Sequence, residues 1–162
     1  EKMKKNLLVM VLVILLSVAT QACAGGSKVK YPENYRSWTH VKSMIIEPGH
    51  PLENPFQGLH HVYGNDKAVK GFEGGEFPSG SILVFDLLNY EENNKTIQEG
   101  KRKLVGVMIK DEKAFKATGG WGFEGFAGDS KIKRLVNDGG KSCYACHTAQ
   151  EKSDFVFSKF RK

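Results

Sequence analysis

The sequence has few of the residues that build disulfide frameworks or metal sites with several protein ligands. It contains three cysteines and five histidines in 162 residues. One cysteine, Cys23, lies near the N-terminus, so two remain in the body of the chain. A disulfide-rich scaffold is therefore excluded. A zinc site would lack a second ligand pair, because four histidines show no paired metal spacing; these are His40, His50, His60 and His61.

Charge of one sign, internal repeats and nucleic-acid motifs are also missing. The formal net charge is +6, but basic and acidic residues are interspersed along the chain. Hydrophobic residues make up 40% and charged residues 26% of the sequence, as in ordinary globular proteins. A chain of this length forms one domain as a first expectation. We therefore predict a single globular domain with no nucleic-acid partner.

An apolar run near the N-terminus is too short for a typical transmembrane helix. It extends from Leu7 to Val18, after three lysines and before Ala22-Cys23-Ala24, which fits a cleavage site. This order is typical of an export signal. We predict a signal peptide over residues 1–24, a flexible spacer over 25–30, a domain over 31–162 and a periplasmic location. A retained membrane anchor is one alternative. Lipid attachment at Cys23 is another, although the residues before it match a lipoprotein signal poorly.

The two remaining cysteines stand in the segment Cys143-Tyr144-Ala145-Cys146-His147. This C-x-x-C-H pattern is the signature of covalent haem c attachment. A disulfide over two intervening residues would add little stability, because it closes a very small loop. A thioredoxin-like site would be expected near the start of a βαβ unit. We therefore predict one haem, bonded by thioethers to Cys143 and Cys146, with His147 as the axial ligand of its iron.

The chain before this motif is rich in strand signals. Strands are predicted over residues 38–46, 58–63, 81–88, 104–110 and 121–126. Short helices are predicted over 65–72 and 130–136, with one helical turn over 111–115 and a helix around the haem motif. Long helical crossovers, which parallel strands require, are missing between the predicted strands. The fold class is therefore α+β, mainly an antiparallel β-sheet with a few short helices and a C-terminal haem site.

These segments together resemble the cytochrome P-460 family, over residues 31–162. The resemblance rests on the order and spacing of seven pieces: Tyr35-Arg36-x-Trp38, His61-Val62-Tyr63, Gly75-Glu76-Phe77-x-x-Gly80, Val107-x-x-Lys110-Asp111, Trp121-x-Phe123, the haem motif, and Asp154-x-Val156-Phe157. It implies a mostly antiparallel β fold, a haem c group and a homodimer.

The family has two branches, and the resemblance places the chain nearer to one of them. In cytochrome P-460 proper, a lysine is bonded to the porphyrin and the protein oxidises hydroxylamine. In cytochrome c′-beta, phenylalanines cap an open iron that binds nitric oxide. The lysine position matches Phe85 here, and Lys70 and Lys95 do not replace it. Phe56 matches the second distal phenylalanine. Phe85 also alternates with Leu83 and Leu87, which predicts an apolar wall over the iron.

Three functions follow from an exported haem c protein of this kind. The first is binding of nitric oxide or another small gas at an open distal site, with or without electron transfer. The second is oxidation of hydroxylamine or turnover of a nitrogen oxide, for which Glu124 and Asp129 are the acids considered for proton transfer. The third is electron transfer by a six-coordinate iron, with a sixth ligand from Met44, Met108, His60 or His61. The last two are neighbours, so at most one faces inward on a strand.

Overall fold

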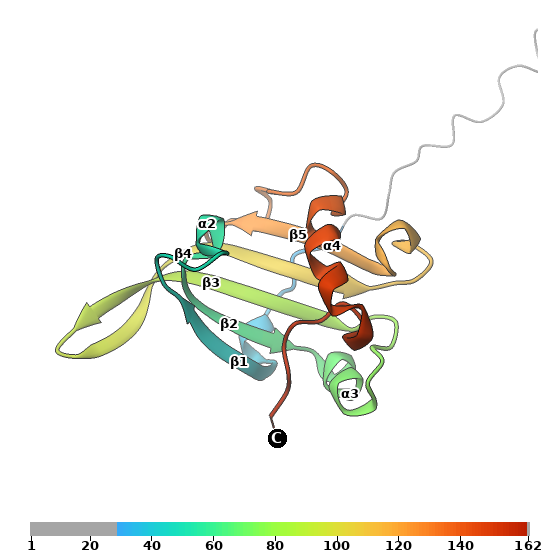
Figure 1. Ribbon diagram of the computed structural model, residues 1–162, viewed down its shortest axis with the longest axis horizontal. Helices are drawn as coiled ribbons and strands as arrows, with labels where there is room; N and C mark the ends of the chain where they lie inside the picture. The colour runs from blue at the N-terminus through green and yellow to red at the C-terminus, as the bar shows by residue number, and fades with distance from the viewer. Residues whose placement is uncertain (1–28, 162) are drawn as a thin grey trace, which may run out of the picture.

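A computed structural model describes residues 29–161, so the predicted signal peptide and most of the predicted spacer lie outside the described residues. Five strands form one sheet in the order β1-β2-β3-β4-β5, and every neighbouring pair is antiparallel (Figure 1). The strands are β1 (Thr39–Ile46), β2 (Gly58–Gly64), β3 (Ile82–Asn93), β4 (Thr96–Lys110) and β5 (Trp121–Ala127). In residues 29–161 no helix has the length and apolar character needed to cross a membrane.

Short helices lie in the connections between these strands and at the C-terminal end. They are η1 (Tyr35–Ser37), α2 (Glu53–Phe56), α3 (Asp66–Gly74), η2 (Lys116–Thr118), α4 (Lys141–His147) and η3 (Thr148–Ser153). The predicted α+β class with a mainly antiparallel sheet is confirmed. Neighbouring strands are antiparallel because each strand returns beside its predecessor without the long crossover that a parallel pair needs.

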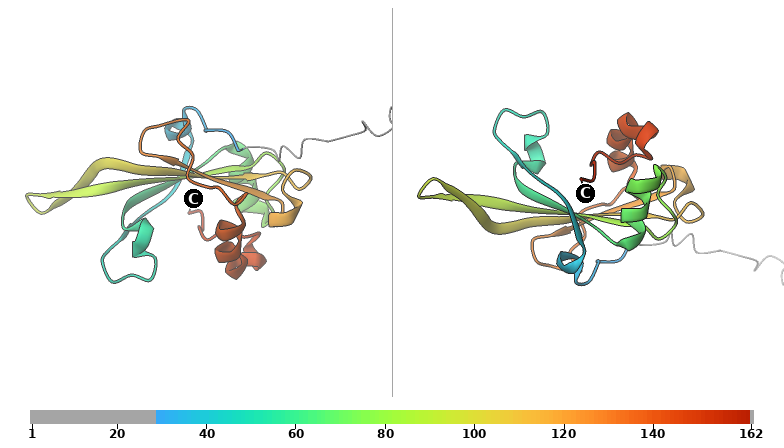
Figure 2. Two further views of the ribbon diagram at one scale, coloured as in Figure 1. Left: turned by 90° about the horizontal axis from the view of Figure 1, so that it is seen from above. Right: turned by 90° about the horizontal axis from the view of Figure 1, so that it is seen from below.

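The two faces of the sheet are covered by different parts of the chain. The N-terminal segment with η1 covers one face, where Val29 and Tyr35 pack with Val84, Val105 and Phe126. The helices α2, α3 and α4 all lie on the other face (Figure 2). A second core cluster on that face contains Phe77, Trp121 and Phe123. The predicted haem motif, which lies in α4, is therefore on the helix-covered face.

The predicted helix over residues 65–72 is confirmed as α3, with both ends set by local chemistry. The Asn65 side chain accepts a hydrogen bond from the Ala68 N–H at 2.9 Å and so satisfies a free donor of the first turn. At the other end, Gly75 has a φ of 85°, a left-handed conformation that glycine adopts without steric cost. The predicted turn over 111–115 is also present, with Phe115 N–H donating to Asp111 O at 2.9 Å.

The predicted helix over residues 130–136 is wrong, because this segment pairs with the edge of the sheet. Arg134 forms an antiparallel bridge with Phe126, and the Leu135 N–H donates to Gly125 O at 2.8 Å. The segment thereby satisfies backbone groups of β5 that would otherwise lie at an open edge.

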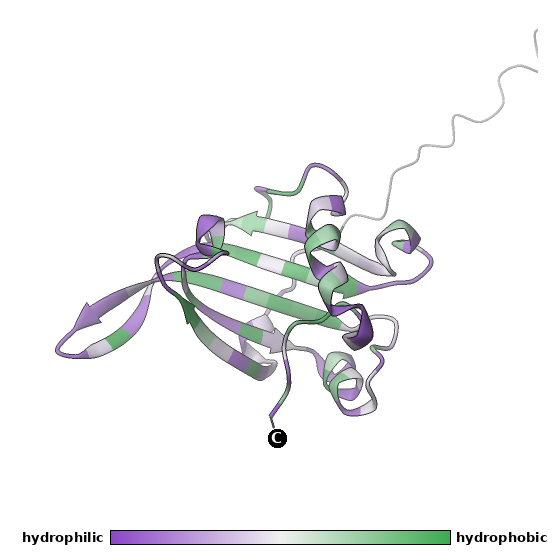
Figure 3. Ribbon diagram, in the orientation of Figure 1, coloured by the Kyte–Doolittle hydropathy of each residue, from purple (hydrophilic) through white to green (hydrophobic). Residues whose placement is uncertain are grey.

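Strands β3 and β4 are longer than predicted and form an arm beyond the rest of the sheet (Figure 1). The arm is mostly hydrophilic, as Figure 3 shows, so it lacks the apolar alternation that identifies half-buried strands. Asn94 and Lys95 form its turn with φ values of 47° and 65°.

Candidate functional site

The C-x-x-C-H segment forms the helix α4, which begins directly against β5. Gly140 precedes the helix with a φ of 85°, and a Cβ built on it would lie 3.1 Å from the Cβ of Phe123. The Asp138 carboxylate accepts hydrogen bonds from the N–H groups of Gly140 and Ser142. The Ser142 side chain, together with these N–H groups, lowers the pKa of Asp138. Glycine is thus required where the chain turns, and an acid stabilises the first turn of α4.

The two cysteines of α4 are free thiols in different surroundings. Cys143 is half-buried beside the second core cluster, whereas Cys146 is exposed. Burial raises the pKa of the Cys143 thiol above its ordinary value. Cys143 and His147 are four residues apart, so they lie on the same side of one helical turn. The helix therefore presents both a sulfur and an imidazole toward the space beside it.

The His147 imidazole is held in one orientation by a backbone carbonyl and two aromatic rings. Its Nδ1 lies 2.7 Å from Phe155 O, and the rings of Phe123 and Phe157 each lie 5.0 Å away between centroids. A carbonyl accepts only, so Nδ1 carries the proton and Nε2 keeps its lone pair. Burial lowers the pKa of His147, which favours the neutral ring. This arrangement is typical of a histidine that binds a metal through Nε2.

The Phe155 carbonyl is positioned by its neighbour Asp154, whose carboxylate is bound on three sides. Lys110 Nζ donates to it at 2.6 Å, Trp121 Nε1 at 3.2 Å and the Phe77 N–H at 3.2 Å. Asp154 is far from Lys110 and Trp121 in the sequence, and all three belong to the pieces that carried the family resemblance. Sequence reasoning did not find this cluster, because only the fold brings the three together.

The two predicted distal phenylalanines meet on the same face of the sheet. The rings of Phe56 and Phe85 pack edge to face with centroids 5.8 Å apart, and both are half-buried. Phe56 ends α2, and Phe85 lies on β3 between Leu83 and Leu87, as the alternation predicted. Lys70 lies on α3, and Lys95 lies at the turn of the arm.

Two glycines separate this phenylalanine wall from the side of His147. On the face of Phe85, the register places Gly106 next on β4 and Gly125 next on β5. Phe123, which packs against His147, lies two residues before Gly125 on that face. Between the two walls the sheet therefore carries no side chains on these two strands. Neighbouring side chains approach both positions, because a Cβ built on Gly106 would lie 3.4 Å from the Cβ of Phe85 and one built on Gly125 would lie 3.3 Å from the Cβ of Leu135.

The exposed apolar side chains of the structure gather around the same space. Among residues 29–161, six large apolar side chains are exposed, and four of them belong to segments that border it: Met44, Leu52, Leu135 and Phe157. Leu135 packs over Gly125, and Phe157 packs on His147. Leu135 and Phe157 thus form an apolar rim beside Gly125 and His147. The sulfurs, the imidazole and this apolar rim together fit a porphyrin attached at Cys143 and Cys146.

The other residues considered from the sequence fall on both faces. His60 and Met44 are paired in register and lie on the Phe85 face, and Met108 also lies on this face but packs into the core. His61 lies on the opposite face, where its Nδ1 is 2.6 Å from Ser43 Oγ. The two acids do not reach the site; Glu124 pairs with Arg134 at 2.6 Å, and Asp129 pairs with Arg102.

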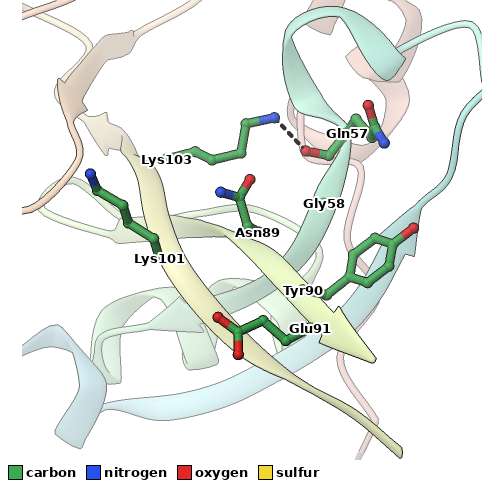
Figure 4. Close-up of a pocket in the computed structure, with 7 residues that line it drawn as sticks. All are labelled: Gln57, Gly58, Asn89, Tyr90, Glu91, Lys101 and Lys103. Atoms are coloured by element: carbon green, nitrogen blue, oxygen red, sulfur yellow. Dashed lines mark hydrogen bonds between the residues drawn. The ribbon is translucent and has the colours of Figure 1, made fainter. Parts of the chain in front are cut away.

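A separate hollow lies at the base of the arm, away from α4. Seven residues from the start of β2 and from strands β3 and β4 line it, and the Lys103 ammonium there donates to Gln57 O at 2.6 Å (Figure 4). None of the predicted haem or distal residues lines this hollow.

Comparison with known proteins gives one match over most of the chain. The sequence pattern of the family described as Cytochrome P-460 matches residues 32–158. The chain belongs to the cytochrome P-460 family. The match covers every strand of the sheet and the C-x-x-C-H helix, so cytochrome P-460 membership applies to the fold and to the haem c character of the protein together. The comparison with curated proteins returned no match for the chain.

Proposed function

We propose that the protein is a haem c protein with an open distal iron position that binds nitric oxide or another small gas. Thioethers to Cys143 and Cys146 would hold the porphyrin, and Nε2 of His147 would be the axial ligand. The observation that carries this proposal is the pair of opposed walls on one sheet face: the oriented His147 on one side and the phenylalanines 56 and 85 on the other. When bound, the haem iron supplies a coordination site for the ligand.

The residues on the His147 side would hold the imidazole in the orientation in which it binds the iron. The Phe155 carbonyl holds the proton of His147 on Nδ1, and the rings of Phe123 and Phe157 restrict rotation of the imidazole. This hydrogen bond at Nδ1 would also raise the basicity of Nε2, the nitrogen that would bind the iron. The chain thus provides one strong, preoriented nitrogen ligand.

The residues on the opposite wall favour small uncharged ligands. Phe56 and Phe85 supply no lone pair for the iron, and their apolar edges disfavour charged ligands that would lose hydration. The resemblance matches Phe85 to the position of the bonded lysine in the hydroxylamine-oxidising branch, so we expect no amine from this position to reach the porphyrin. Both features support gas binding over hydroxylamine oxidation.

An absorption spectrum of the ferrous protein tests the proposal. We expect a high-spin spectrum that changes on addition of nitric oxide or carbon monoxide. A strongly red-shifted Soret band, with a lysine bonded to the haem by mass spectrometry, would support the enzyme branch. A low-spin spectrum that ignores both gases would support a six-coordinate electron carrier. Substantial oxidation of hydroxylamine by the purified protein would also contradict the proposal.

We further propose that the protein is exported to the periplasm as a homodimer, as the sequence and the resemblance led us to expect. The predicted signal peptide over residues 1–24 supports export, and the projecting β3–β4 arm supports contact with a second copy. The mass of the mature chain tests the cleavage, and also separates free from lipid-modified protein. Sedimentation equilibrium tests the dimer, which would give twice the mass of one chain.

A further inference from the structure

His60 lies on the face of the sheet that carries the predicted distal wall. It is the third residue of β2, paired in register with Met44 on β1 and Leu87 on β3. Its ring packs against that of Phe85, with centroids 4.4 Å apart and an angle of 36° between the planes. The neighbouring His61 lies on the opposite face, because successive side chains of a strand alternate.

The imidazole of His60 is buried and has an unpaired polar atom. The residue is 3% exposed, and its Nδ1 has no hydrogen-bond partner within the described part of the chain. Burial, followed by the charge of Lys42, lowers the pKa of His60 to about 4, so the ring is neutral near pH 7. Lys42 and His61 are the charged or titratable groups that act on it.

Buried polar atoms without a partner are rare in folded proteins, and each one calls for an explanation. A purely structural role explains the buried imidazole poorly, because an apolar side chain would pack against Phe85 without desolvating a polar atom. The neighbours of His60 on its face are mostly apolar: Met44, Phe85 and Leu87. A neutral imidazole offers one donor and one acceptor, so His60 places a hydrogen-bonding group directly beside Phe85.

We infer that His60 is the hydrogen-bonding residue of the distal pocket and donates to a polar small ligand at the iron. This inference rests on the proposed function, since it needs an open distal position. The wall then discriminates in two ways. The phenylalanines exclude large or strongly hydrated ligands, and the imidazole favours those that gain negative charge at their outer atom. Distal hydrogen-bond donors are one of the means by which haem proteins select among ligands.

The test compares His60→Leu with His61→Leu in the haem-loaded protein. Both variants remove one imidazole from β2, but His61→Leu alters the opposite face and is the matched control. In His60→Leu we expect the carbon–oxygen stretching frequency of the ferrous carbon monoxide complex to rise. The affinity of the ferric protein for azide should fall about tenfold, as expected for one lost hydrogen bond. In His61→Leu both quantities should equal those of the wild type. His60→Gln, which keeps a donor, should fall between the wild type and His60→Leu.

Two kinds of result would overturn the inference, and they are distinguishable. If His60→Leu and His60→Gln both match the wild type in stretching frequency and azide affinity, His60 makes no distal hydrogen bond, although the open site stands. If the ferrous wild type is low-spin, binds no carbon monoxide and becomes high-spin only in His60→Leu, then His60 is itself an iron ligand. That second result would overturn the proposed function as well, and it is visible in the wild-type spectrum alone.

Discussion

Asp154 shows how a residue outside the C-x-x-C-H motif can help to orient the predicted ligand His147. Its carboxylate binds the ammonium of Lys110, which is 6% exposed, and its backbone leads directly into the Phe155 carbonyl that orients His147. The motif alone identifies His147, but it does not reveal what holds the ring. That information depends on contacts between positions more than thirty residues apart, and such contacts have no local sequence signal.

Replacing the carboxylate tests this anchor. We expect Asp154→Asn to lower the free energy of unfolding by about 3 kcal/mol, because the buried Lys110 charge loses its partner. The variant should also broaden or shift the ferrous spectrum, since His147 loses its fixed support. Urea unfolding and absorption measure the two effects. Asp129→Asn is the control; that side chain is 71% exposed, so the loss of its pair with Arg102 should cost less than about 1 kcal/mol. Equal losses in the two variants would contradict the anchor.

The buried imidazole of His60 predicts a pH dependence of stability. Its pKa in the folded protein is about 4, below the ordinary value of 6.5, so between these values the unfolded chain binds a proton that the native state does not. The resulting stability is fully present above pH 6.5 and is lost as the pH falls toward 4. Between pH 7 and pH 4.5 we expect the wild type to lose about 2 kcal/mol more than His60→Leu. Urea titrations at the two pH values measure this, and equal losses would show that the ring is not held neutral.

At the scale of elements, the sequence predicted buried strands correctly, because their apolar pattern reflects burial. It predicted exposed segments poorly. The predicted strand over 121–126 is β5, and the glycine at its second position leaves room for Phe115, whose ring would lie 2.4 Å from a Cβ on Gly122. The arm was missed because its strands are solvated on both faces and show no apolar period. The helix prediction for residues 130–136 was wrong for another reason, because pairing with β5 outweighs a weak local helix preference.

The turn of the arm offers a test at this scale. Asn94 and Lys95 are both in the left-handed region, which two-residue hairpin turns require and which costs a lysine free energy. We expect Lys95→Gly to raise the free energy of unfolding by up to about 1 kcal/mol. Lys101→Gly, in the strand β4 of the same arm, should lower it by a similar amount, because glycine weakens an extended strand. Urea unfolding of the two variants checks the opposite signs, and a decrease in both would contradict the turn geometry.

At the scale of the molecule, the site is divided between distant parts of the chain. One wall comes from α2 and β3, the glycines between the walls from β4 and β5, and the other wall from α4 and the C-terminal segment (Figure 2). The attachment residues are predicted from the sequence alone, because the C-x-x-C-H spacing is a local signature. The phenylalanine wall was predicted only from the family resemblance. Its place beside the glycines depends on the sheet register, which the sequence alone does not reveal. The orientation of His60 toward the site, and of His61 away from it, likewise required the register.

Removal of the haem should therefore destabilise the molecule by uncovering a specific surface. We expect the double variant Cys143→Ser/Cys146→Ser, freed of haem, to unfold at lower urea concentration than the loaded protein, because a group bound only by the native state stabilises it. The same apoprotein should bind a hydrophobic dye at the rim around His147, where Phe157 is 47% exposed. Adding Phe157→Glu to the double variant should then reduce dye binding. Ile132→Glu provides the matched control, because Ile132 is 87% exposed in the segment that follows β5 and does not border this space. Dye fluorescence that falls equally in both would mean that the apolar rim is not the surface that the haem covers.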